Sequence, residues 1–254
     1  MSVFLRAEWR KLAMANYAVE PSVLTPYLPV GTQLDLWNNT CYVSLVGFMF
    51  LNTRLKGIKV PFHTNFEEVN LRFYVKRRTS SGIKRGVVFV KEFVPKPALT
   101  FIANAIYQEH YQTVPMKHLM ENESAKRIIK VAYKWKLRDW NSFGVIADST
   151  PIDITEGSEE EFITEHYWGY TKTGAARTSE YAVEHPRWRV YLVKDYSLDV
   201  DFGSLYGKTF DFLGNQKPVS VFLAEGSEII VREASSFQAD PAPILEPIIS
   251  EQNR

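Results

Sequence analysis

The stretch Phe66-Glu-Glu-Val-Asn-Leu-Arg-Phe-Tyr-Val-Lys76 decides the fold. Its side chains alternate strictly between polar and apolar from residue 68 onward. Successive side chains of a strand point to opposite faces, so the stretch predicts a strand with one apolar and one polar face. The apolar face carries Val69, Leu71, Phe73 and Val75, and the polar face carries Glu68, Asn70, Arg72, Tyr74 and Lys76.

The polar face of this strand has two interpretations. In the first, the strand is half-buried and its polar side chains face water, as is usual in antiparallel sheets. In the second, the strand belongs to a barrel and its polar row forms the wall of an interior cavity. Asparagine is a poor strand residue, and a short exposed strand has no need of Glu, Asn, Arg and Tyr in line, which favours the cavity.

The segments on either side predict a mainly antiparallel β fold. Residues 4–17 fit a helix or a strand equally well. The alternation of apolar residues and the turn signals predict ten or so strands, most simply arranged as a barrel with appended pieces. Helical elements are expected over residues 21–29 and 97–107 and after a capping box at 158–161, and strands over 33–37, 41–50, 86–93, 127–137, 142–147, 189–196 and, as a hairpin, 218–232.

Length and composition indicate one globular domain. The chain has 254 residues, of which 45% are hydrophobic, enough for a complete core. We find no internal repeat, low-complexity segment or linker that divides it. A single domain is expected over residues 1–240, followed by a loosely held, proline-containing tail over residues 241–254.

Charge and cysteine content exclude several classes of protein. The 30 Lys and Arg residues balance 29 acidic ones, whereas chains that hold nucleic acid normally carry a basic excess. The single Cys41 excludes an intramolecular disulfide and suits a reducing compartment. The N-terminus is charged where a signal peptide is apolar, and no apolar run has the length of a membrane span. We therefore expect a cytoplasmic protein with no nucleic-acid or membrane partner, and self-association is left open.

Common catalytic motifs are missing. Three histidines directly follow a glutamate, at 110, 166 and 185, but neighbours in a strand face opposite ways and cannot share a metal ion. The sequence contains no HExxH, no GxSxG, no GxGxxG and no P-loop. We predict neither a metal site nor a bound cofactor.

Arg72 is the most informative residue of the polar row. A buried guanidinium needs either a carboxylate partner, such as Glu68, or an anionic ligand. Both alternatives stay open at this point. We predict candidate acid–base residues Glu68, His110 and Tyr111, and candidate ligand-binding residues Arg72, Asn70, Tyr74 and Tyr107.

The string from Phe66 to Val75, followed by residues 86–89, a helix, Tyr107, Tyr111 and Met116, resembles the uncharacterised YqjF-like family. That family is similar in fold to acetoacetate decarboxylase, so the resemblance implies an antiparallel β-barrel with an interior active site. The decarboxylase forms a Schiff base through one of two adjacent lysines. The segment expected to hold that pair reads Glu-His-Tyr-Gln over residues 109–112. The resemblance therefore implies the fold without the imine chemistry.

These observations predict a barrel that binds a small carboxylate- or carbonyl-bearing metabolite. If the protein is an enzyme, we expect non-covalent acid–base chemistry at a carbonyl. The alternative is a non-catalytic binding or sensory module for an apolar or aromatic ligand. A cavity walled mostly by aromatic side chains, with Glu68 and Arg72 paired to each other, would favour that alternative.

Overall fold

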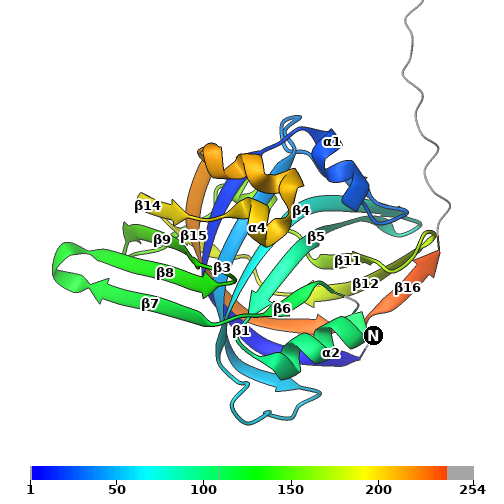
Figure 1. The fold of residues 1–254 in the computed structure, drawn as a ribbon, viewed down its shortest axis with the longest axis horizontal. Coiled ribbons are helices and arrows are strands. Elements are labelled where there is room, and N and C mark those ends of the chain that lie inside the picture. The colour runs from blue at the N-terminus through cyan, green and yellow to red at the C-terminus, as the bar shows by residue number, and fades with distance from the viewer. Residues whose placement is uncertain (1, 108, 239–254) are drawn as a thin grey trace, which may run out of the picture.

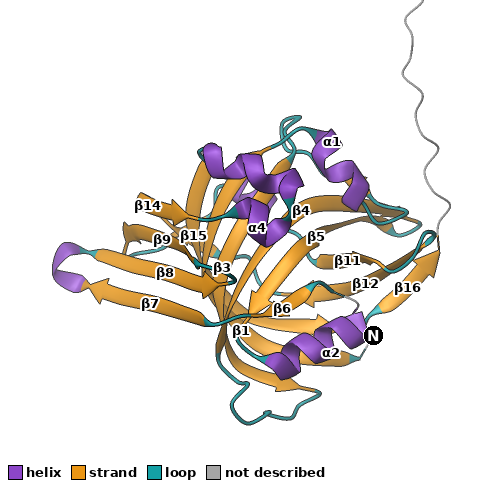
Figure 2. Ribbon diagram, viewed as in Figure 1, coloured by secondary structure: helices purple, strands orange, loops and turns teal. Residues whose placement is uncertain are grey.

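The structure, a computed structural model, describes residues 2–107 and 109–238 (Figure 1). The tail expected over residues 241–254 lies outside the described residues. The mainly β prediction is confirmed, because long strands dominate the chain and the helices are short (Figure 2). Residues 4–17, which the sequence left open, form part of a strand.

Two sheets build the described part of the chain. The larger has twelve strands: β1 (Val3–Ala18), β2 (Gln33–Leu34), β3 (Tyr42–Leu55), β4 (Phe66–Thr79), β5 (Gly82–Val94), β6 (Tyr111–Thr113), β10 (Ile152–Asp153), β11 (Trp168–Lys172), β12 (Arg177–Glu184), β13 (Arg189–Tyr191), β15 (Ser220–Arg232) and β16 (Ser235–Gln238). The smaller has four: β7 (Met116–Glu123), β8 (Ile128–Lys136), β9 (Trp140–Asp148) and β14 (Val193–Asp199). The helices are α1 (Pro21–Leu24), α2 (Pro97–Tyr107), α3 (Glu159–Thr164), α4 (Phe202–Tyr206) and the 3₁₀ turns η1 (Thr25–Tyr27), η2 (Ser124–Lys126) and η3 (Lys208–Asn215).

The larger sheet is strongly curled. Its backbone pairings run from β15 through β1, β3, β4, β5 and β11 to β12. β12 pairs in turn with β15, where Val183 lies opposite Val231, so the path of pairings returns to its starting strand. The curl leaves an inner face, enclosed by its own strands, and an outer face.

Strand β4 has one row of side chains on the outer face of the larger sheet and one row on its inner face. Its apolar side chains Val69, Leu71 and Phe73 are fully buried in a core that they share with Tyr133 and Trp135 of the smaller sheet. The side chains of the polar row point the other way, into the curl. Glu68, Asn70 and Arg72 are only 2%, 1% and 7% exposed. The interpretation in which this row faces water is therefore wrong.

Three predicted elements differ from the structure. The strand expected over residues 189–196 divides into β13 of the larger sheet and β14 of the smaller one. The pattern that follows the capping box predicts a helix with Tyr170 on its apolar side, but the helix ends at Thr164 and Tyr170 lies on β11. Ser158 still caps it, because its hydroxyl accepts a hydrogen bond of 3.2 Å from the Glu161 backbone. The predicted hairpin over residues 218–232 is one continuous strand, β15. None of the helices in the described ranges has the length and apolar character needed to cross a bilayer.

Gly226 lies inside the continuous strand β15, where the hairpin was expected, and its geometry predicts a large stability effect. It pairs with Arg10 inside β15 with a φ of 78°, and a Cβ there would lie 2.0 Å from the Trp9 carbonyl oxygen. Gly226→Ala should lower the free energy of unfolding by at least about 2 kcal/mol, because it adds left-handed strain and a backbone clash. Urea unfolding measures this. Gly174→Ala, whose Cβ would have no neighbour nearer than 3.8 Å, is the control, and an equal loss in both variants would contradict the argument.

Candidate functional site

A cavity of about 150 Å³ lies inside the curl of the larger sheet. Strands β4, β5, β11 and β12 contribute to its wall, together with β1, β3 and helix α2. Most of the wall is hydrocarbon. The polar side chains that line it are Glu68, Asn70, Arg72, Glu92, Glu109, Tyr111, His166 and Tyr181, with Thr53 and His63 elsewhere on the wall.

Three buried glutamates meet in this cavity. Glu68 lies on β4, and Glu92 comes next to it because Asn70 and Glu92 are register partners on β4 and β5. Glu109 follows helix α2 and is held by the Thr171 hydroxyl, which donates to its Oε1 at 2.7 Å. Glu68 accepts hydrogen bonds from Asn70 Nδ2 at 2.9 Å and from the Tyr111 hydroxyl at 3.1 Å. The Glu92 Oε2 atom is buried without a hydrogen-bond partner.

Burial changes the acidity of these carboxyls. It raises the pKa of Glu68 to about 7, although hydrogen bonds from Asn70 and Tyr111 and the charge of Arg72 act in the opposite direction. It likewise raises the pKa of Glu109 to about 7. The pKa of Glu92 lies well above its usual value, because burial is reinforced by the charges of the other two glutamates. Glu68 and Glu109, with pKa values of about 7, can exchange protons near neutral pH, as acid–base catalysis requires.

Arg72 supplies the positive charge of the cavity. Its side chain is buried, and its Nε has no hydrogen-bond partner. Its guanidinium lies 5.7 Å from the centre of the Tyr74 ring. No carboxylate of the described residues forms an ion pair with it, because Glu68 is bound by Asn70 and Tyr111 instead. The structural Glu68–Arg72 ion pair that the sequence left open is therefore not formed.

His166 adds a neutral imidazole to the same wall. Its Nε2 lies 3.3 Å from Asp35 Oδ2, and its Nδ1 is buried without a partner. Burial lowers the pKa of His166 to about 4, more than the hydrogen bond to Asp35 raises it. Burial would raise the pKa of Asp35, but hydrogen bonds from His166 and Arg85 hold it well below its usual range. With Nε2 donating to the Asp35 carboxylate, Nδ1 is left as an acceptor at the cavity.

The structure brings together four of the seven predicted site residues: Glu68, Asn70, Arg72 and Tyr111 all line the cavity. Tyr74 lies behind them, where its hydroxyl donates to Ser44 Oγ at 2.7 Å and its ring packs on His166. His110 is exposed and does not line the cavity; its carbonyl accepts from the Glu92 backbone at 3.2 Å. The side chain of Tyr107, at the end of α2, lies outside the described residues.

Sequence reasoning missed four of the polar residues that lie with Glu68 and Arg72 on the cavity wall: Glu92, Glu109, His166 and Tyr181. Glu92 had a signal, since it interrupts the apolar run of β5. Glu109 and His110 are neighbours that face opposite ways, and the structure places the glutamate inside. His166 and Tyr181 lie far away in the sequence and reach the cavity only through the pairing of β11 with β5 and β12.

The cavity offers no amine for imine chemistry within the described residues, because none of the side chains that line it is a lysine. Lys91 directly precedes the lining residue Glu92 in the sequence. Its ammonium lies 5.7 Å from the ring centre of Phe93, whose side chain belongs to the core on the outer face of the sheet, so Lys91 points away from the cavity. In the same ranges, no group of three or more His, Cys, Asp and Glu side chains is arranged to hold a metal ion.

Comparison with solved structures shows the fold. Acetoacetate decarboxylase from Legionella pneumophila matches with a TM-score of 0.63 at 13% identity, over 92% of this chain and 87% of that one. The enduracididine biosynthesis enzyme MppR, solved with pyruvate, matches with a TM-score of 0.62 at 10% identity, over 91% of both chains. The curled sheet with its interior cavity is therefore an acetoacetate decarboxylase-like fold.

Comparison of sequences shows the family. The uncharacterized protein YqjF of Bacillus subtilis (strain 168) is 32% identical over 80 residues, which are 31% of this chain. The matched stretch spans only 33% of that relative's length. The DUF2071 family, described as an uncharacterized conserved protein, matches over residues 6–228, which is most of the chain. The protein therefore belongs to the DUF2071 family.

Proposed function

We propose that the cavity binds a small carbonyl- or carboxylate-bearing molecule and performs non-covalent acid–base chemistry on it. One observation carries the proposal: the buried Arg72 has a free Nε donor and lines the same cavity as Glu68, whose pKa is raised to about 7. A buried guanidinium without a protein carboxylate is stabilised by an anionic or strongly polar ligand group. Arg72 would bind that group and orient it.

Glu68 would move the proton. In an enolisation, its carboxylate takes a proton from the carbon next to the carbonyl, and the electron pair of that C–H bond moves into the enolate. The protonated carboxyl then returns a proton to the same carbon. Tyr111 and Asn70 hold the carboxyl by hydrogen bonds, so it is oriented before the ligand arrives. A pKa near 7 keeps both of its protonation states available at neutral pH.

The structural neighbours support this class of ligand. One is an acetoacetate decarboxylase and another is a complex with pyruvate, and acetoacetate and pyruvate are both small oxo acids. Imine formation is not part of the proposal, because none of the described side chains that line the cavity is a lysine.

Deuterium exchange tests the acid–base role. We expect the protein to speed the exchange of the C3 protons of 2-oxobutanoate in D₂O above the buffer rate, followed by proton NMR. Glu68→Gln should lower this rate at least about 100-fold, because general base catalysis contributes a factor of that order. The control is Glu67→Gln on the opposite face of β4, where Glu67 binds His118 at 2.6 Å. No exchange above the buffer rate, or equal rates for Glu68→Gln and the wild type, would overturn the acid–base role.

A further inference from the structure

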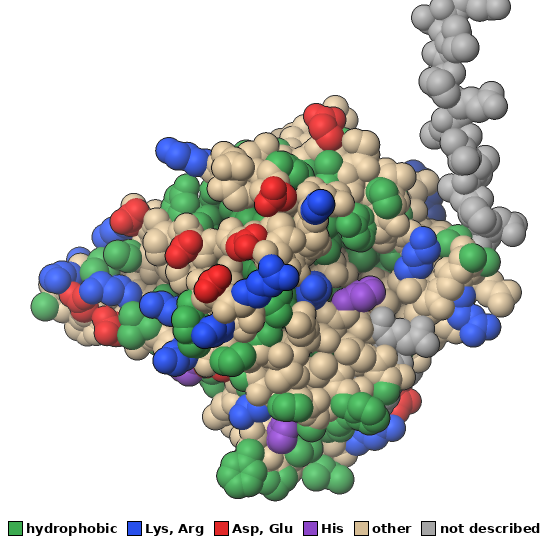
Figure 3. All heavy atoms as spheres, viewed as in Figure 1, with side chains coloured by type: hydrophobic (Ala, Val, Ile, Leu, Met, Phe, Trp, Pro, Cys, Tyr) green, Lys and Arg blue, Asp and Glu red, His purple; other side chains and the backbone are tan. Residues whose placement is uncertain are grey.

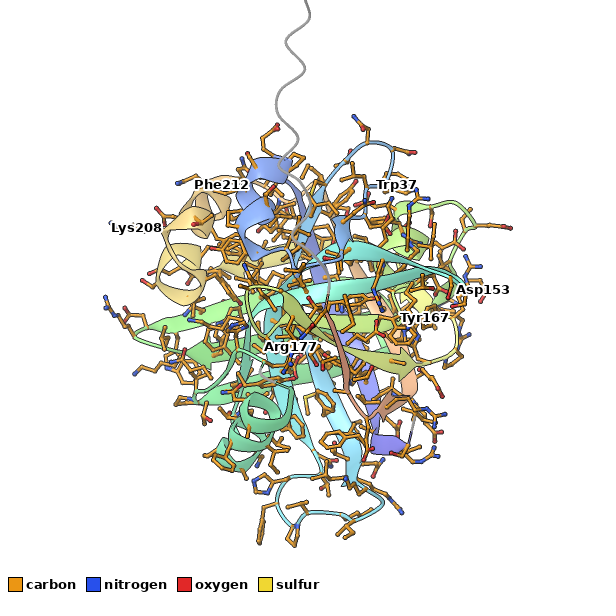
Figure 4. All side chains as sticks on the ribbon, turned by 90° about the vertical axis from the view of Figure 1, so that its right-hand side faces the viewer. Trp37, Asp153, Tyr167, Arg177, Lys208 and Phe212 are labelled. Atoms are coloured by element: carbon orange, nitrogen blue, oxygen red, sulfur yellow. The ribbon has the colours of Figure 1, made fainter. Side chains whose placement is uncertain are left out.

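We place the opening of the cavity between the β3–β4 loop, residues 56–65, and helix α2, because both contribute lining residues that are exposed to solvent. Among its lining residues, Val60 and His63 of the loop are partly exposed, and Ala98 of α2 is exposed. The loop and α2 lie together at the lower end of the molecule in Figure 1. In Figure 4 this end lies opposite the one that carries Trp37 and Phe212.

The wall between this opening and the polar group is hydrocarbon. Phe50 and Phe66 stack with ring centres 4.7 Å apart, and both line the cavity. Leu99 and Ile102 of α2 line it from the other side. A ligand that enters through the opening and reaches Arg72 therefore passes along an apolar surface. If the ligand is long enough, part of it remains in contact with that surface when bound.

The loop and α2 also carry exposed apolar side chains that do not line the cavity. Ile58 and Phe62 of the loop are 69% and 89% exposed, and Phe101 of α2 is 74% exposed. Figure 3 shows hydrophobic side chains gathered at this lower end of the molecule. Exposed apolar groups that cluster around a cavity are typical of an entry site for an apolar ligand.

We infer that the ligand is amphiphilic: a carboxylate or carbonyl head lies at Arg72 and Glu68, and a hydrocarbon body lies along Phe50, Phe66, Leu99 and Ile102. This inference rests on the proposed function for the head and adds the body and the route of entry. It also accounts for the mixed character of the wall, which has many apolar side chains and yet leaves Arg72 without a carboxylate partner.

A chain-length series of straight-chain carboxylates tests the body. Calorimetric titration with acetate, butanoate, hexanoate and octanoate should show affinity rising about fourfold with each added methylene until the cavity is full, as expected from the transfer free energy of a methylene. Equal affinity at every length would overturn the inference and leave the recognition of the head intact.

Hexan-1-ol separates a failure of the proposed function from a failure of the inference. It has the same hydrocarbon body as hexanoate without the anionic head, and we expect it to bind at least tenfold more weakly. Equal binding of the two compounds would contradict recognition of the head by Arg72, and with it the proposed function, even if affinity still rose with chain length.

Two variants of α2 provide a matched pair. Leu99→Asp places a charge on the cavity wall and should abolish the dependence of affinity on chain length. Ala105→Asp places the same charge on an exposed residue of the same helix that does not line the cavity, and should leave that dependence unchanged. Thermal melts of both variants establish that they fold, and an unchanged chain-length dependence in folded Leu99→Asp would contradict the inference.

Discussion

The variant Glu68→Gln should gain stability over the wild type as the pH rises from about 4.5 to above 7. The folded pKa of Glu68, about 7, lies above its ordinary value of 4.5, so the folded protein holds this proton more tightly than the unfolded chain. Wild-type stability from this group is therefore complete below pH 4.5 and is lost as the pH rises through 7. The shift in pKa corresponds to a loss of about 3 kcal/mol in the free energy of unfolding. Glutamine does not titrate, so the variant does not lose this free energy.

The difference between variant and wild type is the quantity to measure, because other groups titrate in the same range. His166, whose folded pKa is lowered to about 4, has the opposite dependence, since its contribution grows as the pH rises toward 6.5. Urea unfolding of both proteins at pH 4.5, 6 and 8 gives this difference, in which the contribution of His166 cancels. Glu67→Gln, on the other face of β4, serves as the control substitution. A difference between Glu68→Gln and the wild type that stays constant with pH would show that Glu68 titrates normally, and would contradict its burial in the cavity.

The variant Arg72→Leu should lose binding and keep stability. Without a ligand, the wild type buries a guanidinium whose Nε has no partner, so leucine should leave the free energy of unfolding unchanged or raise it by about 1 to 4 kcal/mol. Binding of hexanoate should weaken at least about 100-fold, because the carboxylate would then be buried without its charged donor. Urea unfolding and calorimetric titration give the two quantities.

Arg77→Leu is the matched control on the same strand. Arg77 donates to Glu180 Oε2 at 2.8 Å and does not line the cavity. Its replacement should lower stability by leaving a buried carboxylate with fewer partners, and should not change hexanoate binding. If Arg72→Leu bound hexanoate as tightly as the wild type, Arg72 would not be the anion-binding residue.

Strand β4 was predictable because its signal is local. A period of two assigns every side chain of residues 68–75 to one face or the other, and both faces proved to be buried. Sequence alone could not decide what each face meets. The second sheet that covers Val69, Leu71 and Phe73 is formed by strands within residues 116–199, and the sequence of β4 does not predict it.

The candidate site was only partly predictable for the same reason. Glu68, Asn70 and Arg72 share one strand, so their grouping follows from spacing. Glu109 and His110 are neighbours, so only one of them can point into the cavity. An extended backbone alone does not predict which one does. His166 and Tyr181 join through pairings between distant strands, and the need for glycine at 226 comes from its positive φ and from the close approach of Trp9 on β1.

The most direct test of an anion site at Arg72 is the crystal structure of the protein grown with hexanoate. We expect the carboxylate of hexanoate to lie about 2.7 to 2.9 Å from guanidinium nitrogens of Arg72, the distance of a charge-assisted hydrogen bond, with its chain directed toward α2. Arg72 paired with Glu68, and a cavity that holds only water at saturating hexanoate, would contradict the account.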